Sequence, residues 1–234
     1  MNYNQRMATP LLDLLKQHPL FSNLSAAARD RLAGAAISRS YPAGGFLTCA
    51  GDCWPYLFLV VEGRLNVVKE SGEGRSLVIA ELGPGELFWG LAFFQEEMPN
   101  PMTLQINQPA ALYLWRREDI LPLLLENGRL AWELSRLMVK RMLHASEVIE
   151  GLAFQPVAGR LARLLLEFPG QAASGPTARS LTLDDMAARI GSTREMVCRF
   201  LQRFSDSGLI KITRTEFEIT DREQLNSVAQ KAKG

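Results

Sequence analysis

The segment that decides the fold spans residues 181–212 and reads LTLDDMAARIGSTREMVCRFLQRFSDSGLIKI. Thr182 is placed to cap a helix of about eight residues that ends at Gly191, because glycine tolerates the left-handed backbone of a tight turn. Ser192 followed by Glu195 fits the S-x-x-E capping box, which predicts the start of a second helix. The segment therefore predicts two helices joined by a short turn.

The second predicted helix has one apolar and one polar face. Together with the first helix it supplies an apolar set at helical spacing, namely Met186, Ala187, Ile190, Val197, Leu201 and Phe204. Its opposite face presents Arg194, Glu195, Cys198, Arg199, Gln202 and Arg203. Gly208 ends the helix, and residues 209–220 then read as a β-hairpin whose tip carries Arg214.

This order of elements predicts a winged helix-turn-helix, whose second helix reads double-stranded DNA with the residues at its N-terminal end. Arginine donates two parallel hydrogen bonds to guanine, and glutamate accepts one from cytosine. Arg189, Arg203 and Arg214 are better placed for phosphates. The predicted DNA contacts are Ser192, Thr193, Arg194, Glu195, Cys198, Arg199, Gln202, Arg203 and Arg214.

The composition narrows the class of protein. The chain has 234 residues, with 26 Lys and Arg against 25 Asp and Glu, which excludes a uniformly basic nucleic-acid coat. Residues 151–234 hold 12 basic and 9 acidic residues, so the basic excess lies with the predicted DNA-reading helix. Three cysteines are too few for a disulfide scaffold, and neither a secretory signal nor an apolar run of about 20 residues is found. We expect a cytoplasmic protein with no membrane partner.

The remainder of the chain predicts an α+β fold in three parts. From Ile37 to Trp115, short aliphatic and aromatic runs alternate with glycine turns, which is typical of an antiparallel β-roll of the jelly-roll kind. We predict a sensor β-roll at residues 1–115, a dimerisation helix and hinge at 116–152, and the winged helix-turn-helix domain at 153–234.

A long helix is predicted after a break at Gly128. Its apolar stripe consists of Leu130, Leu134, Leu137, Met138, Met142, Ala145, Ile149 and Leu152. A helix that leaves a β-roll cannot bury such a stripe alone, so we expect it to pair with a second copy over residues 130–152, giving a homodimer. The alternative is that the stripe packs only on its own roll. Phe154-Gln155-Pro156 predicts a hinge, with Pro156 placed to start the next helix.

The order of roll, long helix, hinge and winged helix-turn-helix is similar to that of the Crp/Fnr superfamily of bacterial transcription regulators. The resemblance spans nearly the whole chain, through YPAGGFLTCAGD at 41–52 and LFLVVEGRLNVV at 57–68 to the segment at 181–212. It implies a cyclic-nucleotide-binding-like roll, a homodimer and a two-fold palindromic DNA site. It also implies RNA polymerase as a partner, with the loop at 169–180 as the candidate contact.

Within that superfamily, Arg194, Glu195 and Arg199 match the R-E-x-x-x-R pattern of catabolite activator proteins, which read TGTGA half-sites. Oxygen-sensing members usually lack the first arginine of this pattern. The resemblance therefore implies Arg194 and Arg199 on guanines and Glu195 on the opposing cytosine.

The effector is unknown from the sequence, and cAMP is disfavoured. In cAMP-binding members a glutamate in a G-E-L turn holds the ribose, and an Arg-Ser pair holds the cyclic phosphate. The aligned positions here read Trp89-Gly90-Leu91 and Asn100-Pro101, and Glu86 lies three residues too early to substitute. A partly buried phosphate without its arginine would lose its charge partner.

Other effectors stay open. An iron–sulfur cluster of the oxygen-sensing branch needs four cysteines, most of them in an N-terminal run that is absent here, so it is disfavoured. Haem remains a candidate, with His144 or Cys49 as axial ligand. An apolar ligand is another, because Trp54, Phe88 and Phe94 lie near the predicted pocket. The alternatives are that most of these aromatic residues are core residues of the roll, or that the pocket is vestigial and the regulator constitutively active. The pocket residues are predicted to be Trp89, Gly90, Leu91, Phe93 and Asn100.

Thiol oxidation is a further candidate signal. Cys49 and Cys53 flank the turn C-A-G-D-C, where a disulfide is conceivable. Cys198 precedes Arg199 on the DNA-reading face, so its oxidation to sulfinate or sulfonate would oppose the phosphates. The alternative is that all three cysteines are simple packing residues.

The sequence contains no nucleophile–base pair, metal cluster or phosphate-cradling loop, so an enzyme is not expected. A nucleotide-gated module that regulates another protein is the alternative from a different class. The complete winged helix-turn-helix favours a transcription regulator.

Overall fold

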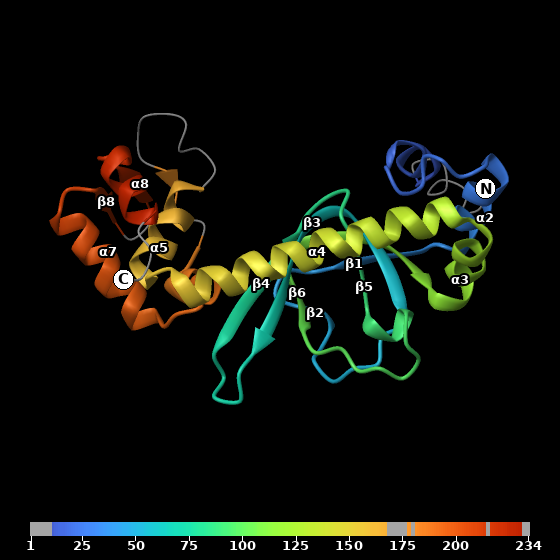
Figure 1. The fold of residues 1–234 in the computed structure, drawn as a ribbon, viewed down its shortest axis with the longest axis horizontal. Coiled ribbons are helices and arrows are strands. Elements are labelled where there is room, and N and C mark those ends of the chain that lie inside the picture. Colours follow the sequence, from blue (N-terminus) through green and yellow to red (C-terminus); the bar gives the residue numbers. More distant parts are fainter. Residues whose placement is uncertain (1–10, 168–176, 179–180, 214–215, 231–234) are drawn as a thin grey trace. The chain divides into compact units, whose positions relative to one another are not determined.

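The structure is a computed structural model that describes residues 11–167, 177–178, 181–213 and 216–230. The chain divides into two compact units, Met1–Lys69 with Ala80–Leu143 and Glu70–Ile79 with His144–Gly234. In Figure 1 the ribbon is coloured along the sequence from the N-terminus to the C-terminus, and its helices and strands carry the labels used here. Within the described ranges, no helix is both long enough and apolar enough to span a membrane.

The predicted β-roll is confirmed as a six-stranded sheet. Its strands are β1 (Ile37–Tyr41), β2 (Phe46–Thr48), β3 (Tyr56–Glu70), β4 (Ser76–Leu82), β5 (Leu87–Trp89) and β6 (Thr103–Arg116). β1, β6, β3 and β4 are neighbours in that order, while β2 pairs with β6 and β5 with β3. The register of β3 on β6 shifts around Gly63, whose φ of 82° and close approach to the Pro109 carbonyl leave no room for a side chain.

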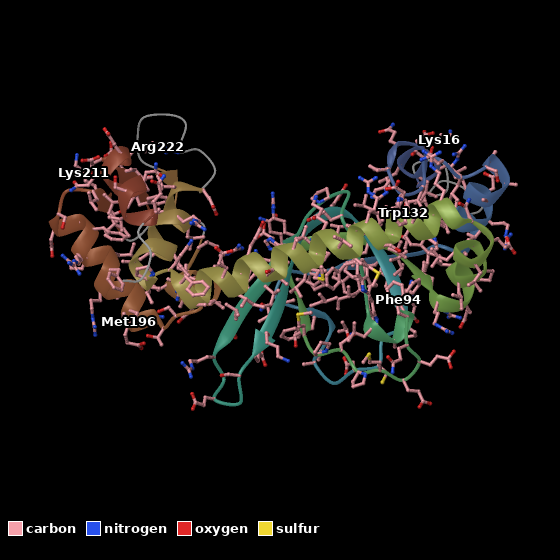
Figure 2. The ribbon with its side chains drawn as sticks, viewed as in Figure 1. Lys16, Phe94, Trp132, Met196, Lys211 and Arg222 are labelled. Atoms are coloured by element: carbon pink, nitrogen blue, oxygen red, sulfur yellow. The ribbon has the colours of Figure 1, made fainter. Side chains whose placement is uncertain are left out.

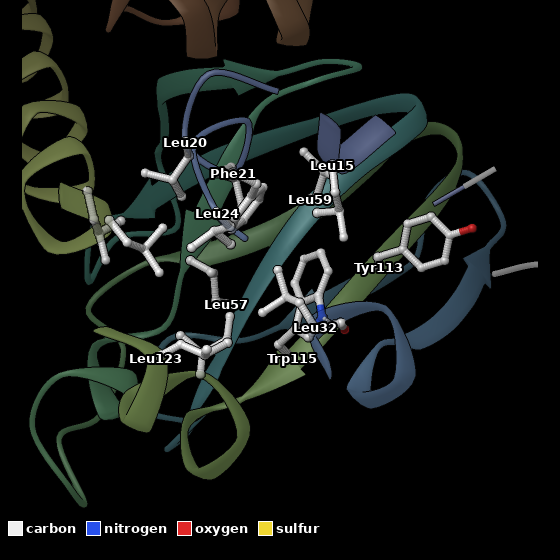
Figure 3. Close-up of a cluster of buried hydrophobic side chains, with 14 of the residues drawn as sticks. Leu15, Leu20, Phe21, Leu24, Leu32, Leu57, Leu59, Tyr113, Trp115 and Leu123 are labelled. Carbon is white, nitrogen blue, oxygen red and sulfur yellow. Dashed lines mark hydrogen bonds between the residues drawn. The ribbon is translucent and has the colours of Figure 1, made fainter. Parts of the chain in front are cut away.

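Two apolar cores lie on the two faces of this sheet, because successive side chains of a strand point in opposite directions. Leu57 belongs to one core and Phe58 to the other. The Leu57 core also takes in α2 (Ala26–Ala35) and the buried Trp115. The Trp115 indole N–H donates to the Leu32 carbonyl at 2.7 Å, which ties the sheet to α2 (Figure 3).

Helix α3 (Arg117–Glu126) is followed by α4 (Gly128–Phe154), so the predicted break at Gly128 is confirmed. The prediction that one stripe of α4 faces a partner is wrong for its first turns. Leu130 and Leu134 are each 3% exposed, in the core that holds Trp115. The apolar side chains that α4 leaves exposed are Trp132, Met138, Val139, Met142, Leu143, Ile149 and Phe154. Trp132 is labelled on this helix in Figure 2.

The second unit contains the predicted winged helix-turn-helix. Its elements are α5 (Val157–Leu166), β7 (Thr177–Ala178), α6 (Leu183–Ile190), α7 (Arg194–Asp206), β8 (Ile210–Ile212), β9 (Glu216–Ile219) and α8 (Arg222–Gln230). The predicted apolar face is confirmed, since Met186 of α6 and Val197 of α7 lie buried in one core. β8 and β9 form the wing, and Arg214, predicted at its tip, lies outside the described residues.

Candidate DNA-binding and effector sites

Helix α6 starts where the sequence predicts. The Thr182 hydroxyl accepts from the Asp185 backbone N–H at 3.1 Å, and the Asp185 carboxylate accepts from the Thr182 N–H at 2.9 Å. This reciprocal capping box satisfies two N–H groups that the helix itself leaves unpaired. The helix ends at Gly191, whose φ of 59° and ψ of 52° lie in the left-handed region. The predicted cap and the predicted glycine turn are both confirmed.

Helix α7 starts one residue later than predicted. Its N-cap is Thr193, whose hydroxyl accepts from the Met196 N–H at 3.4 Å. The Ser192 N–H still donates to the Ala187 carbonyl at 2.9 Å, so Ser192 completes the end of α6 and is not the cap. The predicted capping box from Ser192 is therefore wrong. The shift makes Arg194 the first residue of the DNA-reading helix.

The polar face of α7 is exposed along its length. The exposed residues on it are Arg194, Glu195, Cys198, Arg199, Gln202 and Arg203. The Arg194 guanidinium donates to the Asp184 carboxylate at 2.8 Å. The side chains of Arg199 and Arg203 form no hydrogen bond or ion pair with any residue that the structure describes. Their guanidinium groups are therefore available to an outside acceptor.

Glu195 is held in the ionised form that a base-reading acceptor needs. A hydrogen bond from its own backbone N–H, followed by one from the Thr193 hydroxyl, lowers the pKa of Glu195 below its usual range. The first turn of a helix also favours a negative charge. An ionised carboxylate only accepts hydrogen bonds, which suits the amino group of cytosine.

Arg160 of α5 is a structural residue that the sequence analysis missed. Its Nε donates to the Ile190 carbonyl at 2.7 Å, and its Nη1 to the Gln155 carbonyl at 2.5 Å. Burial lowers the pKa of Arg160, although arginine stays charged in proteins. A cation suits the unpaired carbonyls at the C-terminal end of α6. Arg160 thus joins the predicted hinge to the turn before α7.

Gly90 and Asn100, which the sequence analysis aligned with cAMP-contacting positions, make close contacts within their own chain. A Cβ on Gly90 would collide with the Trp54 carbonyl oxygen, so no larger residue fits there unless the backbone moves. Asn100 is 7% exposed, accepts from the Leu91 N–H at 2.9 Å and donates to the Thr48 hydroxyl at 3.2 Å. Its amide therefore stabilises the surrounding loops.

The aromatic rings of this region contact one another, with Phe88 stacked on Trp89 at 5.4 Å between ring centroids and both Trp89 and Phe93 against Phe94. Phe93 is 2% exposed in the core that holds Trp115, and Trp89 packs against that core. Trp54 and Phe88 pack against the other core. Phe93 is therefore a core residue and not the wall of an open pocket.

All three cysteines are exposed and free. The Cys49 N–H donates to the Asp52 carboxylate at 2.7 Å, so a side-chain cap holds this turn, and the Cys53 thiol lies 3.1 Å from the Glu97 carbonyl oxygen. His144, the candidate haem ligand, is exposed, with its ring 3.6 Å from the Glu147 carboxylate. The described residues contain no group of three His, Cys, Asp or Glu side chains arranged to bind a metal ion.

A cleft of about 480 Å³ lies in the first unit, away from the predicted pocket. It is lined by His18, Pro19, Leu20, Gly85, Glu86, Leu87, Glu133, Arg136, Leu137, Lys140 and Arg141. The Arg141 guanidinium donates to the Glu86 carboxylate at 3.1 Å, and its buried Nε has no partner among the described residues. Glu86 and Arg141 are distant in sequence, so no local pattern could have indicated this pair.

Two known domain families match parts of this chain. Residues 159–228 match the Crp-like helix-turn-helix domain, and residues 38–127 match the cyclic nucleotide-binding domain. The chain is 27% identical over 215 residues to the cyclic AMP receptor protein of Thermus thermophilus, which covers 92% of this chain and 98% of that protein.

Solved structures with the same fold include two regulators. A transcriptional regulator of the crp/fnr family from Eubacterium rectale matches with a TM-score of 0.77 at 23% identity, covering 91% of this chain and 98% of that one. The c-di-GMP-responsive global regulator CLP of Xanthomonas campestris matches with a TM-score of 0.72 at 22% identity, covering 83% and 99%. The two domain matches coincide with the roll and with the winged helix-turn-helix. The chain therefore belongs to the Crp/Fnr superfamily of transcription regulators and carries the DNA-binding helix-turn-helix of that superfamily.

Proposed function

We propose that this protein is a homodimeric regulator whose α7 reads a TGTGA-like half-site in double-stranded DNA. The observation that carries the proposal is the exposed N-terminal end of α7, where Arg194, Glu195 and Arg199 share one face. Arg194 and Arg199 donate to guanines, and Glu195 accepts from the opposing cytosine. Ser192, Thr193, Gln202 and Arg203 border this surface, with Arg203 contacting a phosphate.

The base assignment is tested with Arg194→Ala and Arg199→Ala on TGTGA and TTGAT palindromes. Each variant is expected to lose about 5- to 150-fold in affinity for TGTGA, since a bidentate arginine–guanine pair discriminates by ~1–3 kcal/mol. The loss on TTGAT should be smaller. Arg39→Ala, an exposed arginine of β1, is the matched control and should bind as the parent does. If Arg194→Ala bound both palindromes like the parent, the assignment would be wrong.

The exposed side of α4 supports the homodimer. Trp132 and Val139 are seven residues apart, and so are Met142 and Ile149, while Met142 lies three positions after Val139. This is the spacing of the two apolar positions of a heptad repeat. More than half of each of these four side chains is exposed. A second α4 is the partner that best covers such a stripe.

We propose that the signal is not cAMP, although the Thermus relative is named a cyclic AMP receptor protein. The crowding of Gly90 by Trp54 and the two hydrogen bonds that the buried Asn100 amide makes within its own chain support this proposal. Thiol oxidation is the preferred signal, because Cys198 is exposed on the same face as Arg194 and Arg199. An acidic oxidation product there would repel the phosphates.

The thiol signal is tested by DNA binding before and after mild peroxide treatment. The parent is expected to bind TGTGA-N6-TCACA tightly when reduced and about 10-fold or more weakly when oxidised, as charge repulsion replaces a neutral contact. Cys198→Ser should bind in both states, while Cys49→Ser and Cys53→Ser should stay sensitive. If oxidation weakened DNA binding by Cys198→Ser as much as binding by the parent, oxidation of another group would be responsible.

The cleft beside α4 supports a second candidate signal, a small anionic ligand. Arg136, Lys140 and Arg141 outnumber Glu86 and Glu133 in its lining. Lys140 forms no ion pair with a described residue, and leucine and proline side chains provide an apolar floor. Weak DNA binding in both redox states, raised by a phosphorylated metabolite and not in Lys140→Ala, would favour this signal over oxidation. Haem at His144 or Cys49 has no further support in the described residues.

Contact with RNA polymerase is proposed from the resemblance alone. The candidate loop, residues 169–180, lies outside the described residues apart from 177–178. Deletion of residues 170–175 should preserve DNA binding and lower transcription in a purified system if this loop contacts the polymerase.

A further inference from the structure

The acidic residue Asp184 lies on the surface proposed to face DNA. It is the second residue of α6, and its carboxylate accepts a hydrogen bond from the Arg194 Nη1 at 2.8 Å. The two side chains are 66% and 58% exposed. An ion pair this exposed contributes little to stability. The effect of the Asp184–Arg194 ion pair is therefore on the Arg194 side chain and not on the stability of the fold.

The neighbouring Asp185 shows the contrast. Its carboxylate oxygen Oδ2 accepts from both the Thr182 backbone N–H and the Thr182 hydroxyl in the capping box. Asp184 makes no comparable contact with the backbone and bonds only to Arg194 among the described residues. A carboxylate beside DNA phosphates lowers affinity for every sequence alike. Asp184 is thus unfavourable for general DNA binding, whereas any gain from it must act through Arg194.

The geometry of the guanidinium shows what that gain is. Arginine presents five N–H groups in a rigid plane, and Asp184 engages only Nη1. The edge formed by Nε and Nη2 stays free to donate two parallel hydrogen bonds to O6 and N7 of one guanine. We propose that Asp184 is a positioning residue that fixes the Arg194 guanidinium in this orientation and so sets the base preference at one position of the half-site. The inference rests on the proposed base-reading role of Arg194.

The test is the base preference of the full chain at every half-site position, obtained by selection from a duplex pool with randomised half-sites. Arg194→Ala defines the position that Arg194 reads, whatever the half-site proves to be. Asp184→Asn is expected to lower the guanine preference at that same position roughly 3- to 10-fold, part of the discrimination of a bidentate pair. Its affinity for non-specific DNA should rise about 2-fold, because one negative charge is removed.

Two controls separate positioning from a general effect of charge or stability. Asp206→Asn removes a carboxylate that bonds to Gln202 at the other end of α7, and it should leave the guanine preference intact. Asp184→Asn in an Arg194→Ala background should change no position further. Preferences are ratios within one protein, so a partly unfolded sample does not alter them.

Each outcome decides the inference. Loss of the same guanine preference in Arg194→Ala and Asp184→Asn supports it, even if the half-site is not TGTGA, in which case only the proposed half-site fails. An unchanged preference in Asp184→Asn overturns it. So does an equal loss in Asp206→Asn, and so does an Arg194→Ala variant that loses no preference at any position.

Discussion

At the scale of single residues, His18 shows how burial and backbone contacts fix a protonation state. The Leu20 N–H donates to Nδ1 at 3.2 Å, which leaves the proton on Nε2, 3.0 Å from the Gly85 carbonyl oxygen. Burial lowers the pKa of His18, and the bond to Gly85 opposes this only in part. The neutral ring therefore joins the N-terminal segment to the turn before β5.

This state predicts a pH-dependent stability of the first unit. The unfolded chain takes up a proton on His18 near pH 6.5, and the folded chain only at lower pH, so acid favours unfolding. The free energy of unfolding should fall between pH 7.5 and 5.5, by less than about 1 kcal/mol because solvent screens the partly exposed ring. Tryptophan fluorescence measures this unit alone, since Trp54, Trp89, Trp115 and Trp132 all lie in it.

His18→Gln should flatten this pH dependence, and His144→Gln, which changes the only other histidine, should not. If both variants kept the slope of the parent, the protonation of His18 would not be its cause.

Residue-level predictions from sequence succeeded where the signal is local. The Thr182 cap and the Gly191 turn follow from residue types that lie within a few positions of each other. The prediction of Ser192 as the N-cap of α7 failed because the next residue, Thr193, has an equally suitable side chain and is the actual cap. The decisive bond, from the Ser192 N–H to the Ala187 carbonyl, forms only once α6 is complete.

At the scale of elements, Arg160 connects α5 with the end of α6 and with the residue after α4. It donates to the carbonyls of Ile190, Gly191, Gln155 and Gly151, and no carboxylate takes part in these bonds. The carbonyls of Ile190, Gly191 and Gln155 lie at or just after helix ends, where the helix supplies no partner for them, whereas the Gly151 carbonyl also accepts from the Gln155 N–H at 3.0 Å. Loss of Arg160 would leave several of them unsatisfied at once.

Arg160→Met keeps an apolar stem and removes the donors, so it should destabilise the second unit by about 2–4 kcal/mol. Chemical denaturation followed by far-UV circular dichroism measures this loss, and the tryptophan signal of the first unit should not change. Arg163→Met, at an exposed position of the same helix, is the control and should cost less than about 1 kcal/mol. Equal losses in the two variants would contradict the role given to Arg160.

The long helix shows what periodicity can and cannot predict. Helical spacing gave the presence of α4 and its break at Gly128, because those depend on local sequence. It did not separate Leu130 and Leu134, which enter the core, from Val139 and Met142, which stay exposed. That division depends on where the roll lies against the helix, which is tertiary information. The same tertiary information decides that Phe93 lies in the core, as the alternative interpretation of the aromatic residues expected.

At the scale of the whole molecule, recognition of a palindromic DNA site requires two copies of the chain. A palindromic site presents two half-sites related by a two-fold axis, and a symmetric dimer presents two copies of α7 to them. The exposed heptad-like stripe of α4 is the proposed interface. Charges placed in that stripe should separate the copies and, with them, the two DNA-reading helices.

Met142→Glu and Ile149→Glu should therefore be monomeric in sedimentation or light scattering at concentrations where the parent is dimeric. Their affinity for the palindrome should fall by about 100-fold or more, because one half-site then binds without the effective concentration supplied by the other. His144→Glu places the same charge on another side of α4, where the ring is exposed, and should stay dimeric. If the Met142→Glu/Ile149→Glu double variant remained dimeric, α4 would not be the dimer interface.

The most direct test of the central claim is competition anisotropy of the full chain on TGTGA-N6-TCACA against a scrambled duplex of equal composition, at about 0.15 M salt. The palindrome is expected to bind about 10³-fold or more tightly than the scrambled duplex, with two chains per duplex. Weaker binding overall would still support the claim if this preference remained. Equal affinity for the two duplexes would contradict it.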